Sequence, residues 1–201
     1  MGEGTRLAAT TGAWICFEDE AGQNLPAEGP YLGPPRAYPR GHGLRQGLGA
    51  GVGRGAGVLR PGARGHLFYR VRIHRGRKGE RRSMSEADYA GLIAAAHNQL
   101  HAPVVLIWDN LNTHISTVMG RFVGSHPDWL TEVRLPAYAP ELNAAEGAWA
   151  SMKNGLGNLA VRDVDQLAAI MKNRLKRIQY RPALIDGFLA QTGLTLEPQP
   201  P

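Results

Sequence analysis

The stretch Val104–Trp108, followed by Asp109, constrains the fold of this chain more than any other feature. It reads Val-Val-Leu-Ile-Trp and ends in a carboxylate. An unbroken apolar run in which three of five residues are β-branched is typical of a strand buried on both faces in the middle of a sheet. In open α/β sheets, side chains at the ends of the strands converge on one crevice, where ligands bind. Asp109 is therefore the first candidate for a catalytic residue.

A second apolar run has the same form. Residues 13–17, Ala-Trp-Ile-Cys-Phe, are followed by Glu18, Asp19 and Glu20, which predicts another strand with carboxylates at its tip. Three adjacent acids are more often a solvated turn, but their place at a strand end favours a functional reading. Residues 66–73 alternate between apolar and polar side chains, apart from Phe68, and predict a half-exposed strand.

The remaining pattern predicts helices between strands. Ser85 and Asp88 resemble a capping box that opens a helix ending before Pro103. Further elements are expected as a helix at about 115–124, a short strand at 131–135, a helix from about Leu142 and a long helix at 164–179. This order predicts a mixed α/β fold with a hairpin region first and a parallel crossover later.

A Gly- and Pro-rich segment interrupts this order. Residues 26–56 contain interspersed Arg and almost no apolar alternation, so we expect a disordered or irregular insertion. The expected domains are a loose start at 1–12, a catalytic domain at 13–190 and a tail at 191–201. The Gly-x-Gly pattern near residue 50 is not interpreted as a phosphate cradle, because it lacks the expected strand before it and helix after it.

The charge balance indicates a polyanionic partner or a solvated basic surface. Lys and Arg number 23 against 17 Asp and Glu, with a net charge of +6 and a sequence pI of about 9.8. The lone Cys16 is interpreted as a small core residue. No apolar run reaches the roughly 20 residues that a membrane span needs, and we expect a cytoplasmic protein. The candidate DNA contacts are Arg75, Arg77, Lys78, Arg81, Arg82 and Lys153.

Three acids form a candidate metal site: Asp19, Asp109 and Glu146. If they converge, they repel one another unless divalent cations neutralise them, and hard oxygen ligands suit Mg²⁺ or Mn²⁺. Two such ions can activate a hydroxyl group and stabilise a leaving oxygen in phosphodiester displacement. That chemistry is consistent with a basic protein.

Three motifs occur in order in this chain. They are residues 17–22, Phe-Glu-Asp-Glu-Ala-Gly; residues 108–110, Trp-Asp-Asn, with His114; and residues 135–149, Leu-Pro-Ala-Tyr-Ala-Pro-Glu-Leu-Asn-Ala-Ala-Glu-Gly-Ala-Trp. Together they resemble the DDE transposases of bacterial insertion sequences in the Tc/mariner superfamily. The resemblance runs from about Trp14 to the C-terminus, apart from the Gly-rich segment. The separation of 37 positions between the second and third acids also suits this group.

The resemblance implies an RNase H-like (retroviral-integrase-like) mixed sheet flanked by helices, and DNA cleavage and strand transfer with two metal ions. It makes Asp19, Asp109 and Glu146 both the catalytic residues and the metal ligands. It implies supporting roles for Asn110, His114 and Asn143, with Tyr138 and Trp149 packed beneath the site. The implied partners are transposon-end and target DNA, with a possible homodimer or association with a full-length transposase.

The chain departs from the family in several places. Ala144 stands where the family usually has proline at the start of the helix that carries Glu146, which should loosen this acid slightly. The chain also begins at the catalytic domain without N-terminal helix-turn-helix modules. We therefore expect sequence-specific DNA binding to be absent and activity to be doubtful.

The Gly-rich segment is the larger departure, and the genetic code offers an explanation for it. A synonymous back-translation of residues 26–56, read one nucleotide later, gives a peptide that ends in Arg-Val-Ser-Val-Ala-Gly and resembles the missing family strand. We hypothesise that two compensating frameshifts altered this segment. On this view most of one strand is lost, leaving unpaired backbone groups beside Asp19.

Three functions are considered. The first is a truncated transposase catalytic domain, either active or inactive. The second is a non-enzymatic remnant that binds DNA non-specifically or associates with an intact transposase. A third, a generic RNase H-like repair nuclease, accounts for the acids but not for the Pro-Ala-Tyr-Ala-Pro-Glu-Leu-Asn segment.

Overall fold

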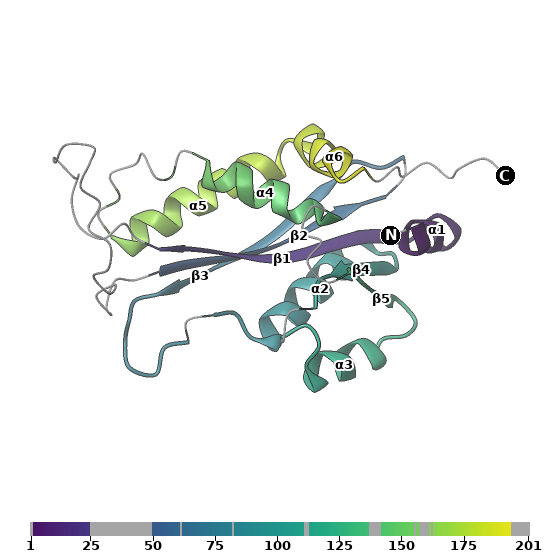
Figure 1. Ribbon diagram of the computed structural model, residues 1–201, viewed down its shortest axis with the longest axis horizontal. Helices are drawn as coiled ribbons and strands as arrows, with labels where there is room; N and C mark the ends of the chain where they lie inside the picture. Colours follow the sequence, from purple (N-terminus) through teal and green to yellow (C-terminus); the bar gives the residue numbers. More distant parts are fainter. Residues whose placement is uncertain are drawn as a thin grey trace.

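A five-stranded mixed sheet forms the centre of the fold in the computed structural model (Figure 1). The strands lie in the order β3 (His66–His74), β2 (Ala50–Leu59), β1 (Trp14–Asn24), β4 (Val104–Trp108) and β5 (Leu130–Arg134). The first three strands pair antiparallel, whereas β1–β4 and β4–β5 pair parallel. The residues that the structure describes are 2–24, 50–60, 62–81, 83–110, 113–136, 142–154, 156, 161 and 163–193.

Helices cover both faces of the sheet. Figure 1 shows one group above the sheet and another below it. The upper group comprises α4 (Ala144–Lys153), α5 (Val164–Gln179) and α6 (Pro182–Gln191). The lower group comprises α2 (Glu86–Leu100) and α3 (Thr117–Gly124). Helix α1 (Gly2–Thr11) lies at the end of the sheet and packs against β4 and β1.

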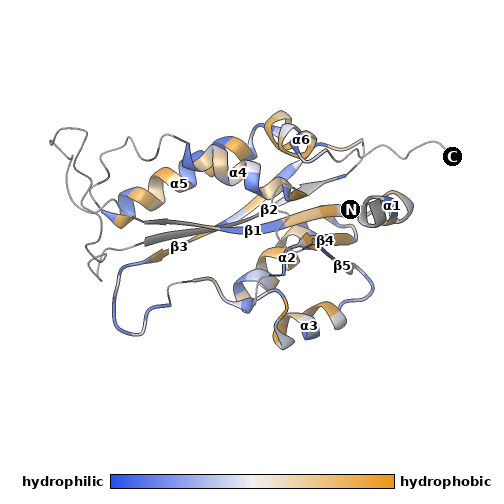
Figure 2. Cartoon of the chain, viewed as in Figure 1, coloured by the Kyte–Doolittle hydropathy of each residue, from blue (hydrophilic) through white to orange (hydrophobic). Residues whose placement is uncertain are grey.

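Strand alternation divides the apolar side chains between two cores. Ile15 and Phe17 of β1 join the cluster that contains α4 and α5, whereas Trp14 and Cys16 join the cluster that contains α2. Strand β4 is buried throughout and contributes to both clusters, as predicted. Figure 2 shows hydrophobic colouring along the buried parts of β1 and β4. Burial raises the pKa of the Cys16 thiol, consistent with its interpretation as a core residue.

Several predicted elements are confirmed with small shifts at their ends. Helix α5 has the predicted bounds, and α2 begins after Ser85, whose backbone N–H donates to the Asp88 carboxylate at 2.9 Å. The predicted loose start was wrong, because residues 2–11 form α1. Its Ala8 is buried, and an added Cβ at Gly4 would lie 3.3 Å from Ile107. Packing against the sheet thus stabilises a ten-residue helix that is too short to be stable alone.

The Gly-rich segment also differs from expectation. Its last part, residues 50–56, belongs to β2, which pairs with β1 on one side and β3 on the other. Glycine lacks a side chain but keeps its backbone donor and acceptor, so two neighbouring strands can hold it in a ladder. The expected irregular structure and unpaired backbone are therefore wrong for residues 50–56. Residues 26–49 lie outside the described residues.

Two glycines give opposite predictions for stability. Gly57 lies between Phe17 and Leu67 on the α4–α5 face of β2, and an added Cβ meets no atom within 4 Å. At Gly147 in α4, an added Cβ would lie 2.7 to 2.9 Å from Phe188. We expect Gly57→Ala to raise the free energy of unfolding by about 1 kcal/mol, and Gly147→Ala to lower it by about 1–3 kcal/mol.

Urea denaturation of the two alanine variants beside the unsubstituted protein measures both effects. The pair forms a matched control, because each variant adds the same methyl group. A loss of stability in Gly57→Ala, or a gain in Gly147→Ala, would contradict this description of the core.

None of the helices among the described residues has the length and apolar character required to cross a membrane.

Candidate active site

The first two predicted acids follow from the parallel pairing of β1 and β4. In that register Phe17 lies opposite Ile107. Asp109 directly follows the last residue of β4, and continuing the register by two residues brings it near Asp19 of β1. The carboxyl ends of these adjacent parallel strands thus bring two of the candidate carboxylates into one region, where the negative charge of Asp109 acts on Asp19.

The third predicted acid is held by the first turn of α4. Asn143 is the N-cap, and its Oδ1 accepts from the Ala145 N–H at 3.1 Å. The same side chain donates from Nδ2 to the carbonyl oxygen of Glu18 at 3.3 Å. Glu146 lies in this capped turn, where the helix dipole favours a negative charge. The Asn143 amide therefore ties the Glu146 turn to the residue before Asp19, and the helix begins at Ala144 without the family's proline.

The pKa of Asp19 indicates that the other two acids are nearby. This pKa is raised to about 7, first because the carboxyl group is buried and then because of the negative charges of Glu146, Glu18 and Asp109. A hydrogen bond of 2.7 Å from the Glu20 N–H to Oδ1 acts in the opposite direction. Among the described residues, Asp19 Oδ2 is buried and has no hydrogen-bond partner. The structure therefore brings the three predicted acids into one electrostatic environment.

His114 joins two of the strand ends through a buried bridge. Its Nδ1 lies 2.7 Å from Asp109 Oδ1, and its Nε2 lies 3.1 Å from Glu18 Oε2. The ring stacks on Trp108 at a centroid distance of 4.4 Å and meets Tyr89 edge-on at 4.8 Å. Both rings restrict the imidazole, so its two nitrogens stay close to the two carboxylates.

The charge state of His114 follows from this bridge. Burial lowers its pKa, but the hydrogen bond and charge of Glu18, together with the charge and hydrogen bond of Asp109, outweigh burial and raise the pKa overall. A protonated imidazole donates from Nδ1 to Asp109 and forms an ion pair with Glu18 through Nε2. The contact between His114 Nδ1 and Asp109 Oδ1 thus restricts the orientation of the Asp109 carboxylate.

Glu18 is the site residue that the sequence interpretation did not single out. Its side chain is about 1% exposed, its carboxylate faces His114, and its carbonyl accepts from Asn143. The signal was present in the strand alternation, because Glu18 follows Trp14 and Cys16 on the buried α2 face. An acid at a core-facing strand position requires a partner. Glu18 thus connects the segments that carry Asp109 and Glu146.

Other predicted supporting residues have structural contacts. Asn110 Nδ2 donates to the Leu135 carbonyl at 3.1 Å, which links the ends of β4 and β5. Trp149 is buried in the α4 core, consistent with packing beneath the site. Tyr138 lies outside the described residues.

The predicted DNA-contact residues have mixed environments. Arg75 pairs with Asp165 at 2.5 Å, and Arg81 lies 3.5 Å from Asp88. Exposed pairs of this kind are weak and can exchange partners. In the described part of the chain, no ion pair involves the remaining cations Arg77, Lys78 and Lys153, all of which are exposed. Arg82 lies outside the described residues.

The side chains of the three acids have the ligand chemistry that a hard divalent cation prefers. They supply carboxylate oxygens, and Asp19 contributes a buried oxygen without a hydrogen bond. Within the described ranges, which omit residues 25–49 and 137–141, no group of three or more His, Cys, Asp or Glu side chains is arranged closely enough to hold a metal ion as it stands.

The raised pKa of Asp19 predicts how stability depends on pH without divalent metal. Because the folded protein binds this proton more tightly than the unfolded chain does, the contribution is complete at low pH and is lost as pH rises from about 4 to about 7. At pH 8, Asp19→Asn should therefore be more stable than the unsubstituted protein by about 4 kcal/mol.

Urea denaturation between pH 4 and pH 8 in EDTA measures this difference. The raised pKa of His114 acts in the same direction, so the difference between the two proteins isolates Asp19. Parallel pH profiles of stability for the two proteins would show that the pKa of the Asp19 carboxyl group is not raised in the folded protein.

The fold of this chain and the acids at its strand ends are similar to those of one class of structure, the RNase H-like fold. Its sheet order and parallel centre have the RNase H-like arrangement that the sequence predicted. The Mos1 strand transfer complex contains a chain with the same fold, at 14% identity and a TM-score of 0.50. That alignment covers 91% of this chain and 56% of the Mos1 chain.

Residues 78–168 match the family model described as DDE superfamily endonuclease. The matched region contains Asp109 and Glu146 and ends before most of α5. Two other Mos1 structures are similar at 15% identity over 91% of this chain. One is the pre-cleavage transpososome, with a TM-score of 0.48 and 57% of that chain covered. The other is the catalytic domain of the mariner transposase, with a TM-score of 0.45 and 84% of that chain covered. No curated protein sequence matches the chain significantly.

Proposed function

We propose that this chain is the catalytic domain of a DDE-type DNA transposase, from the insertion-sequence branch of the Tc/mariner superfamily. It would cleave DNA phosphodiester bonds and join DNA strands. One observation carries the proposal: the charges of Asp109 and Glu146 act on the buried Asp19, and the two lie in the region that matches the endonuclease family. The overall fold is consistent with this function without establishing it.

The carboxylates of Asp19, Asp109 and Glu146 would hold two Mg²⁺ or Mn²⁺ ions. When bound, such ions polarise an attacking water or 3′-hydroxyl group and stabilise the leaving oxygen. The chain's own contribution is to position the ligands. His114 orients Asp109, Asn143 positions the Glu146 turn, and Glu18 contacts both supports.

DNA is the proposed partner. The net charge of +6 and the exposed cations Arg77, Lys78 and Lys153 favour a polyanion, and Arg82 belongs to the same proposed group. The Mos1 structures include a strand transfer complex and a paired-end complex with the left transposon end. We extend the proposal to a homodimer, or association with a full-length transposase, in a nucleoid-associated cytoplasmic location.

We also propose that two frameshifts altered residues 26–56. The register of β2 supports this, because glycines 51, 53, 55 and 57 fall on one face of the strand. The shifted frame would give Arg-Val-Ser-Val-Ala over positions 50–54, with valine at positions 51 and 53. Position 53 lies between Ala21 and Val71, which both belong to the α4–α5 core. The nucleotide sequence tests this, since the codons present either do or do not encode that peptide.

The same glycine face favours a second candidate function. A central strand without side chains on one face buries less apolar surface, which lowers stability. The chain would then be a non-enzymatic remnant that binds DNA non-specifically or associates with an intact transposase.

A plasmid cleavage assay distinguishes the two functions. The probe is a supercoiled plasmid that carries the gene with its native flanking DNA, incubated with the full chain in Mg²⁺, Mn²⁺ or EDTA. The transposase proposal expects nicked or linear plasmid only with a divalent metal. Equal, weak conversion with metal and with EDTA would overturn it and support the remnant.

A further inference from the structure

The corner between α5 and α6 carries a basic surface that is separate from the acid cluster. Between Asp165 and Asp186 the sequence contains no acidic residue. It contains five cations over the same span: Lys172, Arg174, Lys176, Arg177 and Arg181. The solvent-exposed face of a helix ordinarily carries both positive and negative side chains. This one-sided charge is therefore a candidate anion-binding surface.

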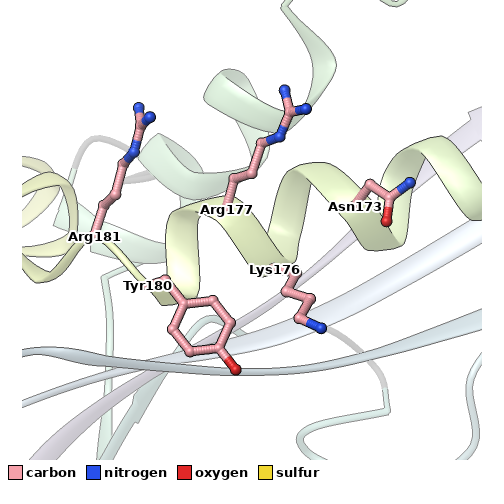
Figure 3. Close-up of a pocket in the computed structure, with 5 residues that line it drawn as sticks. All are labelled: Asn173, Lys176, Arg177, Tyr180 and Arg181. Carbon is pink, nitrogen blue, oxygen red and sulfur yellow. The ribbon is translucent and has the colours of Figure 1, made fainter.

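Two shallow hollows meet at this corner. One, of about 490 Å³, is lined by Asn173, Lys176, Arg177, Tyr180 and Arg181, as Figure 3 shows. The other, of about 220 Å³, lies between α5, α6 and the end of α4, and it shares Arg177 and Arg181. Figure 3 shows these two guanidinium groups on one side of α5, with Lys176 and Tyr180 on the other. A chain of phosphates could therefore contact both hollows through the shared arginines.

The cations at this corner are available to a ligand. Lys176, Arg177 and Arg181 are exposed, and none of the ion pairs in the part of the chain that the structure describes includes them. Arg174 has a different role, because its Nη1 donates to the Met152 carbonyl at 3.0 Å and also to the Asn154 carbonyl. Arg174 thus fastens the corner to the end of α4 and is not one of the free cations.

Tyr180 gives this surface a second kind of contact. Its side chain is 73% exposed, an unusual state for a large aromatic residue, and Lys176 Nζ lies 6.0 Å from the ring centroid. An exposed ring between cations is the combination with which proteins bind single-stranded nucleic acid, because the cations contact the backbone and a base stacks on the ring. Duplex DNA keeps its bases stacked and would leave the ring unused.

The corner also lies within reach of the acids. Helix α4 carries Glu146 in its first turn, and Ser151 of the same helix lines the second hollow. Five residues along a helix correspond to about 7.5 Å of axial rise. An extended strand of a few nucleotides could therefore reach from one site to the other.

We propose that Lys176, Arg177, Tyr180 and Arg181 bind single-stranded DNA, the cations contacting phosphates and Tyr180 stacking on an unpaired base. This inference extends the proposed function, because it assigns the DNA substrate a second contact surface beyond the three acids.

Fluorescence anisotropy with a labelled 20-nucleotide single strand, in EDTA and at several salt concentrations, tests the proposal. We expect Tyr180→Ala to weaken binding roughly tenfold and Tyr180→Phe to preserve it, since phenylalanine retains the ring. The double variant Arg177→Gln, Arg181→Gln should weaken binding and reduce the slope of log affinity against log salt by about 1.4. Arg121→Gln, an exposed arginine in α3, is the matched control.

Two results would overturn the proposal. One is unchanged binding in the tyrosine and double-arginine variants. The other is tighter binding of a duplex of the same sequence, with no effect of Tyr180→Ala on the single strand, which would indicate a non-specific polyanion surface. Since binding is measured without metal, it is independent of cleavage. If the unsubstituted chain shows no metal-dependent cleavage while it and Asp109→Asn still bind the single strand, the proposed function is rejected. The proposal for this surface then still stands.

Discussion

Asp109→Asn is expected to reduce metal-dependent DNA cleavage by about 10³-fold. The substitution removes one negative ligand and leaves the side-chain shape almost unchanged. A bound metal contributes several kcal/mol of transition-state stabilisation, and a loss of about 4 kcal/mol corresponds to about 10³ in rate. Initial rates of plasmid nicking in Mg²⁺ and in Mn²⁺ measure the effect.

The matched control for this variant is Asp128→Asn. Asp128 is an exposed acid between α3 and β5, outside the candidate site. Its amide variant should cleave at the unsubstituted rate, whereas Asp109→Asn should keep its fold and its DNA binding. Equal cleavage by the two variants would exclude Asp109 from the reaction.

Glu18→Ala is expected to lower the free energy of unfolding by about 3 kcal/mol. The change leaves a buried His114 without one of its two carboxylates, and breaking a buried pair from one side costs far more than an exposed pair is worth. For a chain of this length the corresponding fall in Tm is roughly 6–12 °C. Thermal and urea unfolding at pH 6 measure it.

Glu18→Gln separates charge from shape at the same position. The amide retains an oxygen that can accept from His114 Nε2, so we expect less than half of the alanine effect. The backbone carbonyl that accepts from Asn143 is unchanged in both variants. If alanine and glutamine variants are both as stable as the unsubstituted protein, Glu18 does not connect the site in the way described above.

The core strands could be predicted, and the acids singled out as candidates, because their signals are local. The run Val104–Trp108 is apolar at every position, which is typical of a strand buried on two faces, and Asp109 follows it. Similarly, the bounds of α5 followed from apolar spacing between Asp163, which caps the helix, and Tyr180. Where the sequence pattern and the packing favour the same element, the prediction is confirmed.

The differences arise where contacts distant in sequence decide the structure. Helix α1 depends on packing against β4, and β2 depends on strands that pair on both sides of it. Neither effect is visible in a glycine-rich segment or in a short helical segment alone. The role of Glu18 depends on His114, 96 positions away in the sequence, and could be inferred only after the β1 alternation had assigned it to a buried face.

Calorimetric titration with Mn²⁺ at pH 8 tests the central claim most directly, since that claim is the joint binding of a divalent metal by Asp19, Asp109 and Glu146. The unsubstituted chain should bind Mn²⁺, and Asp19→Asn, Asp109→Asn and Glu146→Gln should each bind at least tenfold more weakly, with Asp128→Asn unchanged. Binding of equal strength in all five proteins would contradict the account, because the metal would then be held by other residues.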